Sequence, residues 1–214
     1  MPQTVRFASP DGTPLVASHT PAPPGRPAVV VVPGYQSRKE NHADYAEALS
    51  RAGMAALVLD VRGHGESGGT LDENALDDVI AALDWLAQRH TGPLGLRGSS
   101  MGGYLSVLAA ERHRRVRAVV ALCPAQAETL RRRAEFDLPD LPELADNVMR
   151  PGVARGYWHA RGDETVPWQG TFALAQVTPQ PRRLRVMLRG DHRSLQHDPR
   201  VIDETVAFLG EHLR

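Results

Sequence analysis

One segment, from Gly98 to Gly102, constrains the fold of this 214-residue chain more than any other stretch. Its sequence, Gly-Ser-Ser-Met-Gly, matches the pattern G-x-S-x-G between a short apolar run and a stretch with apolar residues at helical spacing. Glycines two residues before and after a serine remove the Cβ atoms that would clash where a strand turns sharply into a helix. Only Ser100 has both glycines, so the pattern predicts a strand–turn–helix unit that presents the Ser100 hydroxyl.

Apolar runs typical of buried strands alternate with amphipathic helical patterns along most of the chain. The expected strands cover residues 28–32, 55–59, 94–97, 118–122, 157–160 and 184–188. The expected helices cover residues 41–51, 73–90, 102–113, 168–176 and 199–213. Such alternation favours right-handed crossovers and a doubly wound, mostly parallel sheet, which is an α/β fold. Two short runs near the N-terminus, 4–7 and 15–19, flank a turn sequence and predict a hairpin.

A second turn of chemical interest follows the valine-rich run at 28–32, where the chain reads Pro33-Gly34-Tyr35 before the next helical pattern. In a parallel sheet this turn lies at the same edge as the turn that carries Ser100. The backbone N–H groups of Tyr35, and of Met101 at the head of its helix, can then converge on a developing alkoxide. Tyr35 and Met101 are therefore the predicted oxyanion-hole residues.

Charge and cysteine content limit the partners and the compartment. The chain has 25 basic and 25 acidic side chains, and this balance argues against nucleic acid or an anionic membrane as the main partner. The single cysteine, Cys123, excludes an internal disulfide and is typical of a small buried hydrophobic residue. The N-terminus has no signal-like apolar segment, and no apolar run is long enough to span a membrane, so we expect a cytoplasmic protein. No metal or cofactor motif occurs in the sequence.

The stretch from 125 to 152 interrupts the alternation of strands and helices. It contains several prolines and two short helical patterns, 125–133 and 143–149, and it falls at the edge where the active site is expected. We therefore expect one domain, 1–214, with a small cap at 125–152; the alternative is an ordinary long crossover. Its apolar side chains either line the pocket or anchor the cap, while the three consecutive arginines at 131–133 face water. These apolar side chains are Leu130, Phe136, Leu138, Leu141 and Leu144.

Together with the turn at Ser100, three further motifs in chain order carry a resemblance to a known family. They are the segments 60–67, 159–167 and 189–192. With them the chain, from Val29 to Phe208, resembles the α/β-hydrolase fold, in particular compact bacterial serine esterases related to feruloyl esterases and dienelactone hydrolases. The resemblance implies that 159–167 carries a catalytic acid and 189–192 a catalytic histidine. Pro33 stands where the family often has histidine.

A serine nucleophile needs a base within hydrogen-bond reach and a carboxylate that fixes the tautomer of that base. In this family the partners follow in the order serine, acid, histidine, each on a loop after a late strand. His192 and Asp163 meet this requirement, so the predicted catalytic residues are Ser100, Asp163 and His192. The neighbouring groups set aside on position are Glu164, Asp191, His197 and His212.

These residues predict a serine hydrolase that cleaves small aliphatic or aryl carboxylic esters through an acyl-enzyme, with no cofactor and no metal. The alternatives with the same triad are an acyltransferase or perhydrolase, a thioesterase, a lipase and a peptidase. A ligand receptor without catalysis is a further alternative. The expected partner is a small-molecule ester, with no nucleic acid and no membrane, and the existence of a homodimer stays open.

Overall fold

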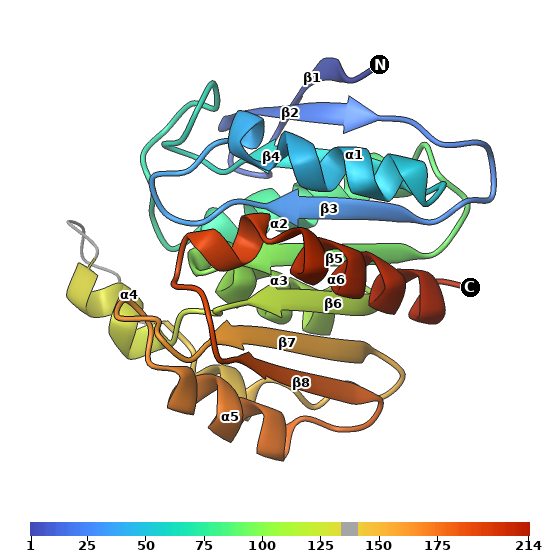
Figure 1. Cartoon of the computed structure of the whole chain (residues 1–214). Coiled ribbons are helices and arrows are strands. Elements are labelled where there is room, and N and C mark those ends of the chain that lie inside the picture. Colours follow the sequence, from blue (N-terminus) through green and yellow to red (C-terminus); the bar gives the residue numbers. More distant parts are fainter. Residues whose placement is uncertain (134–140) are drawn as a thin grey trace.

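The structure is a computed structural model that describes residues 1–133 and 141–214. Over these residues the strands form one eight-stranded sheet in the order β1-β2-β4-β3-β5-β6-β7-β8 (Figure 1). The strands are β1 (Gln3–Ala8), β2 (Pro14–Thr20), β3 (Ala28–Val32), β4 (Ala55–Asp60), β5 (Leu94–Ser99), β6 (Val116–Leu122), β7 (Ala154–Ala160) and β8 (Arg182–Met187). The first two strands are antiparallel to their neighbours, and the other six run parallel. The predicted hairpin and mostly parallel sheet are therefore confirmed.

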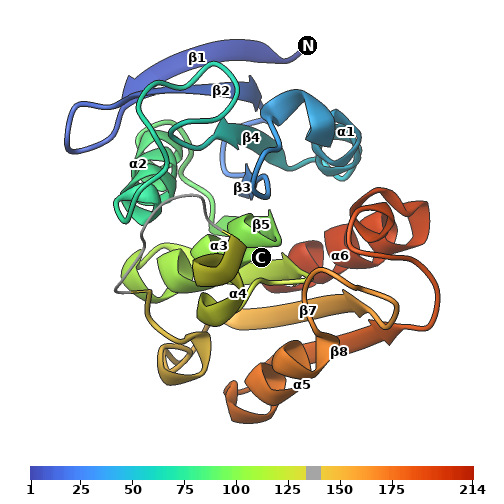
Figure 2. The ribbon, with the colours of Figure 1, turned by 90° about the vertical axis from the view of Figure 1, so that its left-hand side faces the viewer.

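Helices cover both faces of the sheet, as a doubly wound architecture requires. They are α1 (Ala43–Arg51), α2 (Ala75–Ala87), α3 (Met101–Arg112), α4 (Ala127–Arg133), α5 (Trp168–Val177) and α6 (Pro199–His212). Three short 3₁₀ helices are η1 (Lys39–His42), η2 (Leu144–Asp146) and η3 (Ser194–His197). One apolar core contains residues of α1 and α6, and the other contains residues of α2, α3 and α5. Figure 2 shows α1 and α6 on one side of the sheet and α2 and α3 on the other.

The central strand β3 is apolar on both faces, because helices cover both faces of the sheet. All five residues of β3 are fully buried, and the strand pairs with β4 on one side and β5 on the other. A valine-rich strand suits this position, since β-branched side chains pack well on a pleated surface that is covered on both sides. Because β3 stands in the middle of the strand order, the turn that follows it lies in the middle of the sheet edge.

The parallel strands all end at the same edge, and the loops that follow them carry the predicted site residues. Figure 2 looks onto this edge, with α4 lying over it. The expected helix at 41–51 begins instead with η1 and continues as α1, and the one at 73–90 is shortened to α2. Among the described residues no helix has the length and apolar character needed to cross a bilayer. Two residues expected in the cap, Phe136 and Leu138, lie outside the described residues.

Candidate active site

The turn between β5 and α3 holds Ser100 in a backbone conformation that few residues adopt. Its φ is 53° and its ψ is −120°, and its N–H donates to the Leu122 carbonyl at 2.9 Å. A Cβ atom on Gly98 would lie 2.0 Å from the Gly102 oxygen, and one on Gly102 would lie 2.1 Å from the Val32 oxygen. Both glycines are therefore required by close backbone approach, and the strained turn holds Ser100 at the edge of the sheet.

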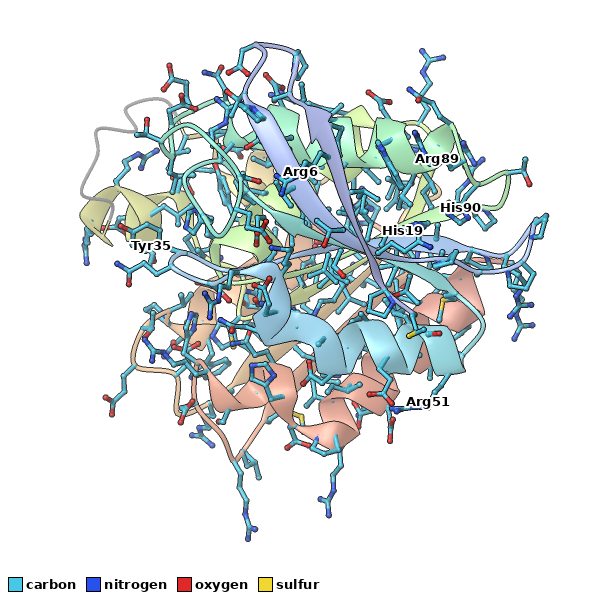
Figure 3. All side chains as sticks on the ribbon, turned by 90° about the horizontal axis from the view of Figure 1, so that it is seen from above. Arg6, His19, Tyr35, Arg51, Arg89 and His90 are labelled. Carbon is cyan, nitrogen blue, oxygen red and sulfur yellow. The ribbon has the colours of Figure 1, made fainter. Side chains whose placement is uncertain are left out.

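The turn after β3 packs against this elbow. A Cβ atom on Gly34 would lie 3.2 Å from the Cβ of Ser100, so the two turns touch. Both predicted oxyanion donors, Tyr35 and Met101, line the same cavity as Ser100. Figure 3 shows Tyr35 at the same end of the molecule as α4. The structure thus brings the three residues together around one opening.

The predicted base and acid meet across 29 residues of sequence. His192 Nδ1 lies 2.7 Å from Asp163 Oδ2, and the other carboxylate oxygen, Oδ1, accepts the N–H groups of Thr165 and Val166, each at 2.8 Å. His192 also lines the cavity with Ser100. Because Nδ1 faces the carboxylate, Nε2 is the ring nitrogen that can take a proton from a serine hydroxyl.

The neighbouring acidic and histidine candidates have other partners. Asp191 Oδ1 accepts the N–H groups of Arg193 and Ser194 and so closes its own turn. His197 Nδ1 lies 2.9 Å from Asp44 Oδ2. Glu164 is exposed beside the buried Asp163. Among these candidates, Asp163 and His192 are the two that contact each other, and His192 lines the cavity.

The Asp163 carboxyl is held in its ionised form. Burial alone would raise its pKa, but hydrogen bonds from His159, His192 and the Val166 amide outweigh burial and hold that pKa well below its ordinary value. An ionised carboxylate is the form that accepts the Nδ1–H of a histidine base and stabilises the imidazolium that forms during catalysis. The electrostatics of the loop therefore suit a catalytic acid residue.

Two residues near this pair carried no functional role in the sequence-based interpretation. His159 lies fully buried on β7, and its Nε2 is 3.2 Å from Asp163 Oδ2. Cys123, buried at the end of β6, has a φ of 43° and lies beside the same carboxylate. In the sequence, His159 could be recognised because it is an imidazole within an otherwise apolar part of a strand, four residues before the candidate acid.

Among the described residues, one group near Asp163 has potential metal ligands close to one another. Ligand atoms of Cys123, Asp163 and His192 all lie within 4.8 Å of one another. A metal would need the Cys123 thiolate. Burial, however, raises the pKa of the Cys123 thiol well above its ordinary value, and the Asp163 carboxylate adds to that shift. The donor set therefore suits a hydrogen-bonded acid–base pair better than a metal site.

A cavity of about 180 Å³ opens beside Ser100 and His192. Most of its other walls are apolar. The apolar lining comes from α2 and its preceding loop, from α3, from the segment around α4, and from the loop between β7 and α5. These side chains are Leu71, Ala75, Tyr104, Leu105, Leu130, Leu141 and Val166. Such a cavity can hold a compact apolar group next to a serine nucleophile.

The segment 60–67 braces the cavity from outside. The buried Asp60 carboxylate accepts the Lys39 N–H at 2.7 Å, the Lys39 Nζ at 2.9 Å and the Glu66 N–H at 3.0 Å. Within the same segment, the His64 ring meets the Tyr35 ring edge-on, with centroids 5.7 Å apart. The segment therefore supports the turn that carries Tyr35, and its histidine lies behind that ring.

Comparisons with known proteins agree with this fold. A family profile, Hydrolase_4, described as serine aminopeptidase S33, matches residues 23–207. The thiohydrolase of Eupenicillium brefeldianum is 32% identical over 132 residues, which is 57% of this chain and 42% of that protein. The esterase YjfP of Escherichia coli is 23% identical over 226 residues, 87% of this chain and 89% of that protein. The chain thus spans less than half the length of the thiohydrolase relative.

Among solved structures, Est1E of Butyrivibrio proteoclasticus with bound ferulic acid has a TM-score of 0.84 at 22% identity. The similarity covers 97% of this chain and 98% of Est1E. At this identity the likeness concerns the fold, and it confirms the predicted α/β-hydrolase architecture. The family match covers most of the chain, so the protein belongs to the Hydrolase_4, or S33, family of α/β hydrolases.

Proposed function

We propose that this protein is a serine hydrolase that cleaves small carboxylic esters through an acyl-enzyme. The observation that carries the proposal is the hydrogen bond of 2.7 Å between His192 Nδ1 and Asp163 Oδ2, beside a cavity that Ser100 also lines. Membership of a hydrolase family and the strained turn at Ser100 support the same reading. The proposed roles are nucleophile for Ser100, base for His192 and orienting acid for Asp163.

In the proposed reaction, Ser100 Oγ attacks the ester carbonyl carbon while His192 Nε2 takes the hydroxyl proton. The carbonyl oxygen becomes an oxyanion, which the N–H groups of Tyr35 and Met101 stabilise. When the intermediate collapses, the bond to the alcohol oxygen breaks and His192 gives its proton to that oxygen. Water then attacks the acyl-enzyme while His192 takes a proton from it, and as the bond to Ser100 breaks, His192 returns that proton to Ser100 Oγ and the carboxylic acid leaves.

The shape and lining of the cavity support a compact apolar acyl or aryl group as substrate. The volume is about 180 Å³, below the range typical of sites for drug-sized ligands, and leucines line much of it. A thioester is the second candidate, since a thiohydrolase is among the relatives. Both substrate classes form the same acyl-enzyme with Ser100 and differ only in the leaving group.

A panel of p-nitrophenyl esters from acetate to decanoate, run beside the matching thioesters, tests the proposal. We expect turnover that is fastest for short acyl chains. Ser100→Ala should lower kcat by roughly 10⁴-fold or more, because the nucleophile is lost. Ser99→Ala is the matched control, since Ser99 is buried next to the nucleophile and lines no part of the cavity. Retained turnover in Ser100→Ala, or no turnover of any ester by the folded protein, would refute the proposal.

A further inference from the structure

His159 on β7 is a second histidine beside the candidate acid. Its Nε2 lies 3.2 Å from Asp163 Oδ2 and 3.0 Å from the Val166 carbonyl oxygen. Both neighbours of Nε2 are acceptors, so this nitrogen carries a proton and donates. On the other side of the ring, Nδ1 lies 2.7 Å from Thr171 Oγ1. The buried imidazole is thus fixed from both sides and aimed at the carboxylate.

One carboxylate oxygen therefore serves two histidines. Asp163 Oδ2 accepts from His192 Nδ1 at 2.7 Å and lies 3.2 Å from His159 Nε2, whose proton it shares with the Val166 carbonyl. Each donor withdraws negative charge from the oxygen and so weakens the bond that the other can form. The second donor also fixes the rotation of the carboxyl group. His159 can therefore set both where the negative charge lies and how strongly it holds His192.

We infer that His159 is a positioning residue of the proposed hydrolase, one that orients Asp163 and limits its attraction for protonated His192. This inference rests on the proposed function, because it assigns His192 as the base. A base held too strongly in its protonated form would be unable to take the proton of Ser100 at neutral pH. Sharing Oδ2 between two donors leaves less negative charge on the oxygen that faces His192.

Other ionisable groups surround the pair and stay unchanged in the variants below. Cys123 faces Asp163 from the end of β6. Asp191 and Arg193 flank His192 in the loop after β8, and Asp191 interacts electrostatically with Asp163. Since their positions do not depend on the side chain at 159, a difference between two variants at that position reports on the bond to Asp163.

Two substitutions at position 159 distinguish loss of the contact with Asp163 from loss of side-chain packing. In His159→Gln the side-chain amide nitrogen takes the place of His159 Nε2, so it can donate to Asp163 and to the Val166 carbonyl. In His159→Asn the shorter side chain places its amide nitrogen where Nδ1 was, so the contact with Asp163 is lost. We expect the acid limb of kcat/KM to move to higher pH by about half a unit or more in His159→Asn. In His159→Gln the limb should stay close to that of the unmodified protein.

A matched control is Tyr157→Phe. Tyr157 is buried two residues earlier on the same strand, and its hydroxyl bonds with Thr178 Oγ1 at 2.9 Å, away from Asp163. This variant should lower Tm without moving the acid limb. The same acid limb in the Asn and Gln variants, or an equal shift in Tyr157→Phe, would overturn the inference. Inactivity of all the proteins, including the unmodified one, would instead count against the proposed function.

A spectroscopic measurement on the unmodified protein covers the case in which the variants fail to fold. Long-range ¹H–¹⁵N correlation of histidine rings identifies which nitrogen carries the proton. The inference requires a proton on His159 Nε2, because only that nitrogen faces Asp163. Observation of His159 as the neutral tautomer with its proton on Nδ1 would rule out the donated bond and with it the positioning role.

Discussion

Two segments border the cavity, and the fold holds them in different ways. The loop after β7 is closed by contacts to one side chain, since Asp163 accepts from Thr165, Val166 and His192 and lies 3.2 Å from His159 Nε2. In the described part of the segment 125–152, the residues near the cavity are held mainly by apolar burial, while Arg150 at its far end donates to the carbonyl groups of Ala110 and His113. Leu144 and Val148 of this segment are fully buried, and the Tyr104 hydroxyl donates to the Pro142 carbonyl at 2.7 Å.

This difference indicates separate roles for the two segments in the proposed site. A loop fixed by several directional bonds keeps Asp163 and His192 in one geometry, as proton transfer requires. A segment held by apolar contacts can vary its cavity-facing side chains without disturbing that geometry. We therefore expect changes in the loop after β7 to lower the rate for every substrate, and changes in 125–152 to alter the choice among substrates.

The largest expected effect comes from Asp163→Asn. Loss of the carboxylate removes the group that fixes the tautomer of His192, and the amide also places N–H groups against two donors. The kcat should fall by roughly 10⁴-fold, and by a similar factor for short and long esters. Steady-state kinetics on the ester panel measure this. A loss confined to one chain length would contradict the division between the two segments.

Two leucines test the other segment as a matched pair. Leu144 is fully buried in the core and is absent from the cavity lining, whereas Leu141 is partly buried and lines the cavity. Leu144→Ala should destabilise the fold by about 2–5 kcal/mol, because it leaves a void, with an unchanged substrate preference. Leu141→Ala should change the preference between short and long acyl chains by about 1–3 kcal/mol in relative kcat/KM.

Denaturant unfolding and the ester panel, measured on both leucine variants, check this pair. A changed acyl-chain preference in Leu144→Ala, together with an unchanged preference in Leu141→Ala, would contradict the assignment of Leu141 to the cavity lining and of Leu144 to the core. An equal loss of stability in both, with no change in preference, would indicate that the segment only closes the core.

The smallest expected effect is a difference in pH dependence. The folded state holds the pKa of Asp163 below its ordinary value, so its contribution to stability is present above about pH 4 and is lost as the pH falls further. The Tm difference between the unmodified protein and Asp163→Asn should therefore shrink between pH 5 and pH 3. The Tm deficit of Leu144→Ala should stay nearly constant there. Parallel curves for both variants would contradict the electrostatic account of the loop.

The sequence predicts the architecture well, because strong local patterns specify it. The valine run of β3 and the glycines around Ser100 have few alternative structures, so both the strand and the strained turn follow from the residues. Asp163 and His192 are predicted from their place after late strands. Their contact itself depends on the register of β7 and β8, which no local pattern contains.

Other features of the site are invisible in the sequence for physical reasons. A buried histidine such as His159 acquires a role only through the atoms that face it, here Asp163 Oδ2 and Thr171 Oγ1. Which leucines of 125–152 face the cavity is equally undetermined, since a short helix with apolar residues on more than one side has no single inward face. The structure separates Leu141 from Leu144, and Phe136 and Leu138 lie outside its described residues.

The central claim, that Ser100 is the activated nucleophile of the cavity, is tested most directly by covalent labelling. The protein is treated with a fluorophosphonate, digested, and the adduct is located by mass spectrometry. We predict a single adduct on Ser100 that is absent in Ser100→Ala and forms much more slowly in Asp163→Asn. An adduct on Ser99 or on a residue away from the cavity, or the absence of any adduct on the folded protein, would contradict the account.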